Sequence, residues 1–306
     1  MIPAECDYYR AGSVGEALDL LETHADRDPE LIAGGHGLVP SMKVGEASPD
    51  VLVDIDGVED LRAVEADDDS VTVGALARHA DVAESETLRE RALVLAEAAE
   101  NVGDVQIRNR GTIGGNLAEA DPAADLPAAV LAADATLDVQ GRDGERTIEA
   151  GEFFRGDGET ALAADEIVTH VRVPRSRGSE TDDTAGAYVK KTHPASGYAM
   201  VGVAADVAVE DGEITEARVA ANGVADRATR LTGVEDALVS RPAADEDAAE
   251  SATKNASADL DSDRLRGDVY ASSEFRAQLL STYARRAVET ALGRATAEGS
   301  IGGDEP

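Results

Sequence analysis

The pattern of hydrophobic residues changes once along this chain of 306 residues, at a polar segment near its middle. Before that segment, short apolar stretches and amphipathic helical stretches are mixed, and glycines follow several of the apolar stretches. After it, three longer stretches alternate between apolar and polar residues, and helical patterns follow. Strands followed by helices are typical of an α+β domain. The sequence therefore predicts an α+β fold in two domains, joined by a linker over residues 174–184.

The first predicted domain covers residues 1–176. Its first helix is indicated by Ser13-Val14-Gly15-Glu16, which has the spacing of a capping box. A longer helix is expected over residues 88–101, because apolar residues recur there at helical spacing. The expected strands are residues 31–33, 51–55, 71–73, 136–139 and 167–173.

The second predicted domain covers residues 184–294. Its expected strands are residues 187–191, 199–209 and 214–221, and Asp211-Gly212 between the last two indicates a tight hairpin. Helices are expected over residues 234–240, 243–257 and 273–292. Residues 295–306 are expected to form a flexible tail.

The charge of the chain limits its partners. There are 62 acidic and 28 basic residues, which gives a net charge of −34. A field of that sign repels nucleic acid and anionic membrane surfaces. Few lysines, many acids and small core residues resemble the composition of halophilic archaeal proteins, although an ordinary acidic protein is the alternative. No apolar run reaches membrane-spanning length and no signal-peptide pattern begins the chain, so a cytoplasmic protein is expected.

The only cysteine is Cys6, so the chain has no internal disulfide and no cysteine cluster for zinc or iron–sulfur. Five histidines are scattered, and none pairs at metal-ligand spacing. We therefore predict no catalytic triad and no metal site. His36 is the one histidine with an expected functional place, and His193 is expected to orient a turn near Tyr198.

Two glycine segments carry the functional signal. Gly34-Gly35-His36-Gly37 follows a predicted strand, and its backbone N–H groups can turn toward a diphosphate. Taken alone, it fits a plain strand-ending turn equally well. It lacks both the Rossmann spacing and the Gly-Lys-Ser/Thr of a P-loop. The second segment, 111–116, precedes Asp125, which either caps the following helix or accepts hydrogen bonds from ligand hydroxyls.

Taken together, the two segments resemble a known family. Residues 33–43 are similar to the first FAD-binding segment of the carbon monoxide dehydrogenase medium-subunit family, and residues 106–116 to its second. The match continues through residues 121–127, and it includes residues 188–190 and 195–199 of the second domain. Gly37 departs from the pattern, because the family often has serine there.

The resemblance implies a vanillyl-alcohol-oxidase (PCMH) type FAD-binding domain, followed by a carbon monoxide dehydrogenase flavoprotein C-terminal α+β domain. It implies that the first loop holds the FAD diphosphate and that the second segment holds the diphosphate and ribityl region. Tyr198 and Lys190 are expected near the flavin ring, with a core position for Tyr198 and a surface position for Lys190 as the alternatives. The FAD-binding residues so implied are Ile32, Ala33, Gly34, Gly35, His36, Gly37, Leu38, Thr112, Gly114, Gly115, Asn116, Asp125, Ile167, Lys190 and Tyr198.

The resemblance also implies partners. Its members are electron-transfer subunits of molybdenum hydroxylases, with an iron–sulfur small subunit and a molybdenum-cofactor large subunit in a heterotrimer or its dimer. The electron acceptor would be NAD, a quinone or oxygen. Two alternatives stay open: a stand-alone FAD-dependent oxidoreductase of the same fold, and a nucleotide-binding scaffold without activity. The substrate is chosen on another chain, so this sequence does not name it.

Overall fold

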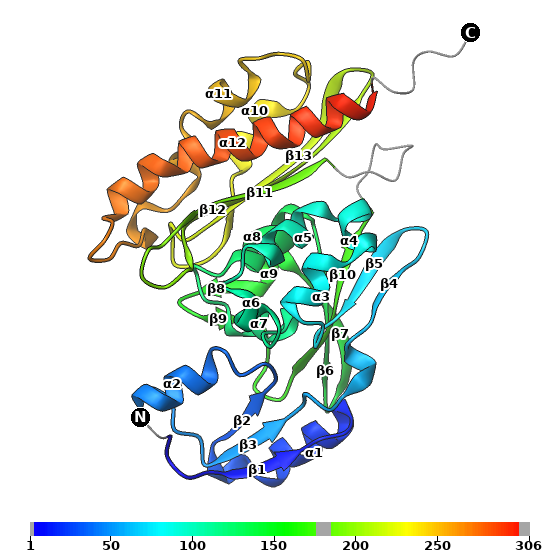
Figure 1. The fold of residues 1–306 in the computed structure, drawn as a ribbon, viewed down its shortest axis with the longest axis vertical. Coiled ribbons are helices and arrows are strands. Elements are labelled where there is room, and N and C mark those ends of the chain that lie inside the picture. Colours follow the sequence, from blue (N-terminus) through cyan, green and yellow to red (C-terminus); the bar gives the residue numbers. More distant parts are fainter. Residues whose placement is uncertain (1–2, 176–184, 300–306) are drawn as a thin grey trace.

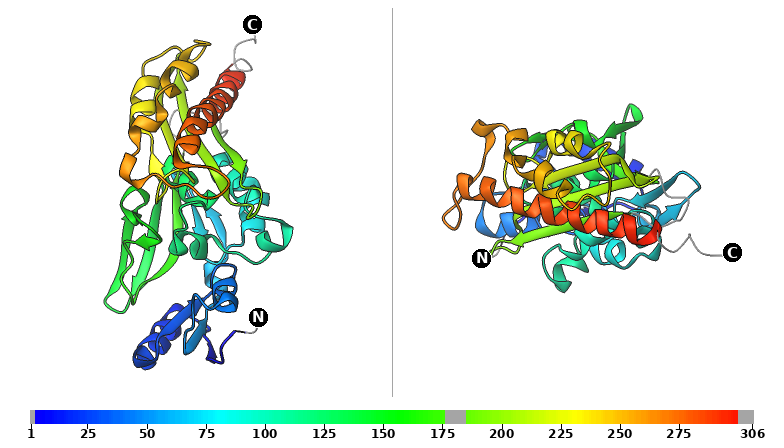
Figure 2. Two further views of the ribbon diagram at one scale, coloured as in Figure 1. Left: turned by 90° about the vertical axis from the view of Figure 1, so that its left-hand side faces the viewer. Right: turned by 90° about the horizontal axis from the view of Figure 1, so that it is seen from above.

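The computed structural model describes residues 3–175 and 185–299. Three lobes follow one another along the long axis, with the N-terminal lobe at the bottom of Figure 1 and the C-terminal lobe at the top. The side view in Figure 2 shows the same order. Helices and strands are mixed throughout, which confirms the α+β prediction. The first two lobes together correspond to the predicted first domain.

The N-terminal lobe is a small parallel sheet with helices. Its strands are ordered β1 (Asp7–Arg10), β3 (Val51–Asp54) and β2 (Pro29–Ile32). Helix α1 (Val14–Thr23) begins as predicted at Ser13, whose hydroxyl accepts the Glu16 N–H at 3.1 Å. The lobe also contains α2 (Leu38–Val44) and the 3-10 turns η1 (Ala25–Arg27) and η2 (Glu59–Leu61). Strand β2 pairs with β3 in parallel, and its carboxyl end points toward the middle lobe in Figure 1.

The middle lobe is built on a five-stranded antiparallel sheet. Its strands are ordered β4 (Val64–Ala66), β5 (Ser70–Gly74), β10 (Ile167–Pro174), β6 (Thr136–Gly141) and β7 (Gly144–Glu149). Seven helices accompany it: α3 (His79–Glu84), α4 (Glu86–Arg91), α5 (Leu93–Glu100), α6 (Val105–Arg108), α7 (Ile113–Glu119), α8 (Asp125–Ala132) and α9 (Ala150–Phe153). A short hairpin, β8 (Phe154–Gly156) and β9 (Glu159–Thr160), completes the lobe.

The C-terminal lobe is a four-stranded antiparallel sheet, ordered β11 (Gly186–Thr192), β12 (Ala199–Glu210), β13 (Glu213–Asn222) and β14 (Thr229–Arg230). The predicted hairpin is confirmed, because Asp211 and Gly212 have φ of 51° and 79°, as a type I′ turn requires. Helices α10 (Thr232–Leu238), α11 (Ala248–Thr253) and α12 (Ser273–Gly299) cover one face, where α12 runs along the sheet in Figure 1. The 3-10 turns η3 (Ala256–Asp259) and η4 (Ser262–Arg264) link them.

Strand β12 is buried on both faces, although its sequence alternates. Val201 and Val203 pack in the core beneath α12, whereas Ala204 packs in the core of the middle lobe. Successive side chains of a strand point to opposite faces, so both faces of this sheet are covered. The second domain is therefore joined to the first by a continuous apolar interface. Buried aromatic side chains are few among the described residues, and Ala, Val, Leu and Ile fill the cores as the composition predicts.

Four predicted boundaries were wrong. The helix expected over residues 88–101 is two helices, because Ala92 leaves the helical conformation, with φ of −152° and ψ of 52°. The helix expected over residues 243–257 is only α11 and η3, since Asp245 accepts the Asp247 N–H at 3.0 Å in a competing turn. Strand β10 continues through Pro174, where the linker was expected to start, and residues 176–184 lie outside the described residues.

The fourth correction concerns the tail. Helix α12 continues past residue 294 to Gly299, so the first residues of the expected flexible tail are helical. Ala295 packs against the C-terminal core, and Arg294 forms an ion pair with Glu97 of the middle lobe at 2.6 Å. These contacts hold the end of the helix in place. Residues 300–306 lie outside the described residues.

Candidate functional site

The first glycine segment forms the loop between β2 and α2. Gly35 has a φ of +71°, which a side chain would strain, and its carbonyl accepts the Val39 N–H at 3.1 Å. No hydrogen bond recorded among residues 3–175 and 185–299 uses the backbone N–H groups of residues 34–38. A row of unpaired N–H groups on a glycine loop is suited to an anion such as a diphosphate.

The second segment begins helix α7. Thr112 caps this helix, and its hydroxyl oxygen accepts the Gly115 N–H at 3.3 Å. The Gly114 N–H donates to the Ala75 carbonyl at 2.8 Å, and a Cβ at position 114 would lie 2.5 Å from the Ala75 Cβ. Gly114 is therefore explained by packing inside the middle lobe, whereas Gly115 is exposed.

The two segments touch each other. A Cβ added to Gly34 would meet the Arg110 carbonyl oxygen and lie 2.7 Å from the Gly111 Cα. Only glycine permits this approach, because the obstacle is backbone. The Ala33 Cβ lies 4.0 Å from the position of a Cβ on Gly115. Two segments separated by more than 70 positions in the sequence thus line one site at the junction of the N-terminal and middle lobes (Figure 1).

Two buried polar atoms at this site have no hydrogen-bond partner among the described residues, Asn116 Oδ1 and His79 Nδ1. Buried polar atoms are normally paired, so Asn116 Oδ1 is suited to a donor from a bound molecule. His79 packs beneath Gly111, where a Cβ would lie 2.7 Å from its Nε2. Burial, followed by the positive fields of His36 and Arg108, lowers the pKa of His79 to about 4, so its ring is neutral. Nothing in the sequence indicated that His79 would pack beneath the second glycine segment.

Glu119, the last residue of α7, has its carboxylate at the first glycine loop. The sequence did not predict an acid at this place. A Cβ at Gly37 would lie within 2.5 Å of the Glu119 Oε2. Loss of solvation, followed by the nearby Asp121, raises the pKa of Glu119. A side chain at position 37 would therefore require the flexible Glu119 side chain to move.

Asp125 and Lys190 form a buried ion pair across the two domains. Lys190 Nζ lies 2.9 Å from Asp125 Oδ2, and each side chain is 3% exposed. The Tyr188 hydroxyl donates to Asp125 Oδ1 at 2.6 Å and lies 3.2 Å from Asn222 Oδ1. Burial raises the pKa of Asp125 to about 6, against the lowering effects of Lys190 and Tyr188. Tyr188 was not predicted as part of this cluster.

These contacts exclude two alternatives left open by the sequence, a capping role for Asp125 and a surface position for Lys190. Asp125 does not cap α8, since the cap position is Ala124 and the Asp125 carboxylate points into the cluster with Tyr188. Lys190 is not a surface residue, because its ammonium group also donates to the Asn101 carbonyl at 2.7 Å. Both side chains hold the domains together, and their contact with FAD stays a prediction.

Tyr198 and Ile167 occupy different surroundings. Tyr198 lies between β11 and β12 and is 37% exposed, so it is not a core residue. Desolvation, followed by Glu119, Asp121 and Asp125, raises its pKa to about 12. Its ring is thus close to the end of α7. Ile167 begins β10 and is buried in the apolar core of the N-terminal lobe, against which Ala33 also packs.

A surface groove of about 600 Å³ lies elsewhere, between the start of α1 and strands β6, β7 and β10. None of the predicted residues lines it. Arg146 in this groove pairs with Glu166 at 2.6 Å, and Arg172 pairs with Asp138 at 3.0 Å.

The described residues contain no group of three or more His, Cys, Asp or Glu side chains placed to hold a metal ion. Over the same residues, no helix is both long and apolar enough to cross a membrane.

Comparison with known proteins identifies both domains. Residues 4–176 match the family described as the FAD binding domain in molybdopterin dehydrogenase, and residues 187–291 match the CO dehydrogenase flavoprotein C-terminal domain. The carbon monoxide dehydrogenase medium chain of Hydrogenophaga pseudoflava is 33% identical over 96% of this chain and 99% of its own length. The 6-hydroxypseudooxynicotine dehydrogenase complex subunit alpha of Paenarthrobacter nicotinovorans is 36% identical over 96% of this chain and 97% of its own.

Solved structures agree as well. A chain of carbon monoxide dehydrogenase from Hydrogenophaga pseudoflava superposes with a TM-score of 0.89 at 33% identity, covering 96% of this chain and 99% of that one. Both domains are matched in the order predicted from the sequence, and each match covers the lobes that form the site. The chain therefore belongs to the family of FAD-binding medium chains of carbon monoxide dehydrogenase-type molybdenum hydroxylases.

Proposed function

We propose that this chain holds FAD against its two glycine segments and passes electrons from a partner iron–sulfur subunit to an external acceptor. The single observation that carries this proposal is the contact between Gly34 and Gly111, beside the unpaired N–H groups of residues 34–38. The unpaired Asn116 Oδ1 adds a buried acceptor at the same place. Anion-binding backbone and a polar acceptor together fit a dinucleotide such as FAD.

In this proposal, each part of the chain has a defined task. The N–H groups of residues 34–38 bind the diphosphate, and Asn116 orients a hydroxyl or amide of the cofactor. Neutral His79 supports Gly111 from below without adding charge. Tyr198 excludes water beside the ring. FAD supplies a centre that accepts and releases electrons singly or in pairs, as the exchange between an iron–sulfur cluster and a soluble acceptor requires.

The proposed assembly includes an iron–sulfur small subunit and a molybdenum-cofactor large subunit. The sequence has one cysteine, whereas an iron–sulfur cluster needs several cysteine ligands, so the clusters must be on another chain. The names of the relatives differ in their substrate, carbon monoxide in one case and 6-hydroxypseudooxynicotine in another. Because the oxidised substrate meets the molybdenum site, we assign no substrate to this chain.

The first experiment identifies the cofactor. The chain is purified in concentrated KCl and denatured, and the released molecule is identified by mass spectrometry. We expect FAD at about one molecule per chain, and its loss in a variant that carries Gly35→Asp and Gly115→Asp, because carboxylates then face the diphosphate. Gly293→Ala is the matched control, since a Cβ there meets nothing within 4 Å. A protein that never retains flavin, even when isolated from its host, would contradict the proposal.

A second experiment tests the partners. The tagged chain is isolated from its native host, and the complex is assayed for molybdenum and iron. Copurified subunits that carry both metals are the expected result. An isolated chain that turns over substrates by itself, without those subunits, would instead indicate a stand-alone flavin oxidoreductase.

A further inference from the structure

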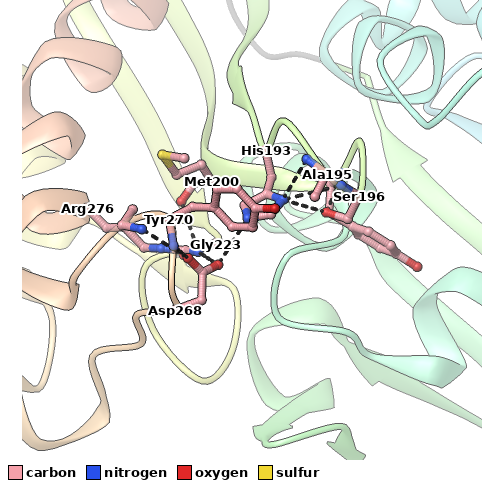
Figure 3. A network of polar contacts seen from close by, with 10 residues as sticks. His193, Ala195, Ser196, Met200, Gly223, Asp268, Tyr270 and Arg276 are labelled. Atoms are coloured by element: carbon pink, nitrogen blue, oxygen red, sulfur yellow. Dashed lines mark hydrogen bonds and ion pairs between the residues drawn. The ribbon is translucent and has the colours of Figure 1, made fainter.

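The turn between β11 and β12 is organised by one histidine. His193 Nδ1 lies 3.3 Å from the N–H nitrogens of Ala195 and Ser196, and 3.1 Å from the Ser196 hydroxyl (Figure 3). The two backbone groups can only donate, so Nδ1 must present its lone pair. The other ring nitrogen, Nε2, lies 3.2 Å from the Asp268 carboxylate but makes no hydrogen bond among the described residues. The expected turn-orienting role of His193 is thus confirmed in its contacts.

Asp268 is itself fixed. One carboxylate oxygen accepts the N–H groups of Tyr270 and Ala271 at 2.8 and 3.0 Å. The other pairs with Arg276, whose side chain is 8% exposed at the start of α12. The Tyr270 ring meets the His193 ring edge to face, with centroids 4.8 Å apart. The imidazole is thus held by hydrogen bonds at Nδ1, by the Tyr270 ring and by the nearby Asp268 carboxylate.

The same network reaches the first domain. Arg276 Nη1 donates to the Gly223 carbonyl at 2.7 Å and lies 3.4 Å from the Met200 carbonyl (Figure 3). The Gly223 N–H in turn donates to the Pro122 carbonyl at 2.8 Å, in the segment that follows α7. Arg276 of α12 and the segment after α7 are therefore joined by hydrogen bonds through Gly223, and the 193–198 turn meets this network at the contact between His193 and Asp268.

Tyr198 depends on this turn for its position. Its carbonyl accepts the His193 N–H at 2.8 Å, and its N–H donates to the Ser196 hydroxyl at 3.4 Å. No hydrogen bond recorded among the described residues involves the Tyr198 hydroxyl, and its side chain is 37% exposed. The orientation of the ring is therefore determined by the backbone of the turn, which His193 holds closed.

We propose that His193 is a positioning residue: by accepting hydrogen bonds from the turn through Nδ1, it holds Tyr198 over the flavin ring. This inference rests on the proposed function, since it requires FAD at the site. In this proposal, His193 acts through the backbone of the turn and thereby controls how closely the Tyr198 ring covers the flavin. Loss of the Nδ1 acceptor leaves two N–H groups unpaired, which opens the turn and moves Tyr198 away.

The test uses the fluorescence of FAD bound to the full chain, because a tyrosine in contact with a flavin quenches its emission. Tyr198→Leu defines the unquenched level. His193→Ala is expected to recover at least half of that rise. His193→Asn is expected to stay near the wild-type level, because an asparagine oxygen can accept the same backbone N–H groups in an Asx turn. His24→Ala is the control, since His24 also stacks on a tyrosine, at 4.6 Å, but in the N-terminal lobe.

The outcomes separate the two proposals. Wild-type protein that retains no FAD contradicts the proposed function. Wild-type protein that retains FAD, with emission unchanged in Tyr198→Leu or in His193→Ala, overturns the positioning role instead. Emission in His193→Asn equal to that in His193→Ala also overturns it, because the hydrogen bonds to Nδ1 would then not hold the ring. Recovery in His193→Ala together with rescue by His193→Asn supports it.

Discussion

The contact between the two glycine segments can be tested by the smallest possible change, Gly34→Ala. The added Cβ would lie 2.7 Å from the Gly111 Cα, whereas carbon atoms in contact are about 3.5–4.0 Å apart. The segments must therefore separate by about 1 Å. Overpacking of this kind costs about 1–3 kcal/mol, and here both sides are backbone, which cannot rotate away.

The separation also affects FAD. A displacement of about 1 Å lengthens an N–H···O hydrogen bond from about 2.9 Å to beyond the limit for such a bond. A hydrogen bond to a charged group contributes about 1.5–3 kcal/mol, so loss of one bond to the diphosphate corresponds to about 10- to 150-fold weaker binding. We therefore expect Gly34→Ala to lower both the unfolding midpoint and the FAD affinity.

The assay is a flavin-fluorescence titration of the FAD-free protein at fixed KCl, together with thermal unfolding in the absence of FAD. Gly151→Ala is the matched control, because a Cβ at that helical position meets nothing within 4 Å. Its affinity should equal that of the wild type. If Gly34→Ala binds FAD within about twofold of the wild type, a change of less than half a kcal/mol, the two segments do not form one binding surface.

Three further predictions concern charge. Glu119→Gln should bind FAD about fivefold more tightly at neutral pH, a difference of about 1 kcal/mol, because the ionised carboxylate opposes the diphosphate. Wild-type affinity should fall as pH rises through the raised pKa of Glu119, whereas an equally steep fall in Glu119→Gln would contradict this role. Burial raises the pKa of Asp125 from 3.8 to about 6, so the stability that its proton confers is full below pH 3.8 and lost as pH rises through about 6. Relative to Asp125→Asn, the wild-type free energy of unfolding in urea should fall by about 3 kcal/mol from acid to neutral pH, and parallel profiles would refute this. Finally, the unfolding midpoint should rise with KCl up to about 1 M, where the screening length is about 3 Å, because the net charge is −34; a flat profile would mean that repulsion does not limit stability.

The sequence predicted the helix cap and the turn that depend only on residues close together in the chain. The I′ turn at Asp211-Gly212 and the Ser13 cap formed as predicted, although Glu16 accepts the Gly12 N–H and not the Ser13 N–H that a full capping box requires. The glycine segments were found for the same reason. Their glycines indicate that the backbone turns sharply there or closely approaches another part of the chain or a ligand.

Other features, such as a break between two helices, could not be predicted from the sequence. The break at Ala92 has no proline or glycine to mark it, because tertiary packing of two short helices outweighs a continuous helical pattern. The alternation of β12 predicted a strand but not its burial, and the docking of the two domains covers both of its faces.

The sequence by itself thus determined the two-domain α+β plan, the acidic charge and the positions of the two glycine segments that we predict to bind an anion. Only the tertiary structure decided what those loops approach. It placed Gly34 on Gly111, Glu119 beside Gly37, and Asp125 against a lysine 65 positions later. The physical reason is that such contacts depend on how whole lobes pack, and no spacing along the chain encodes the distance between residues far apart in it.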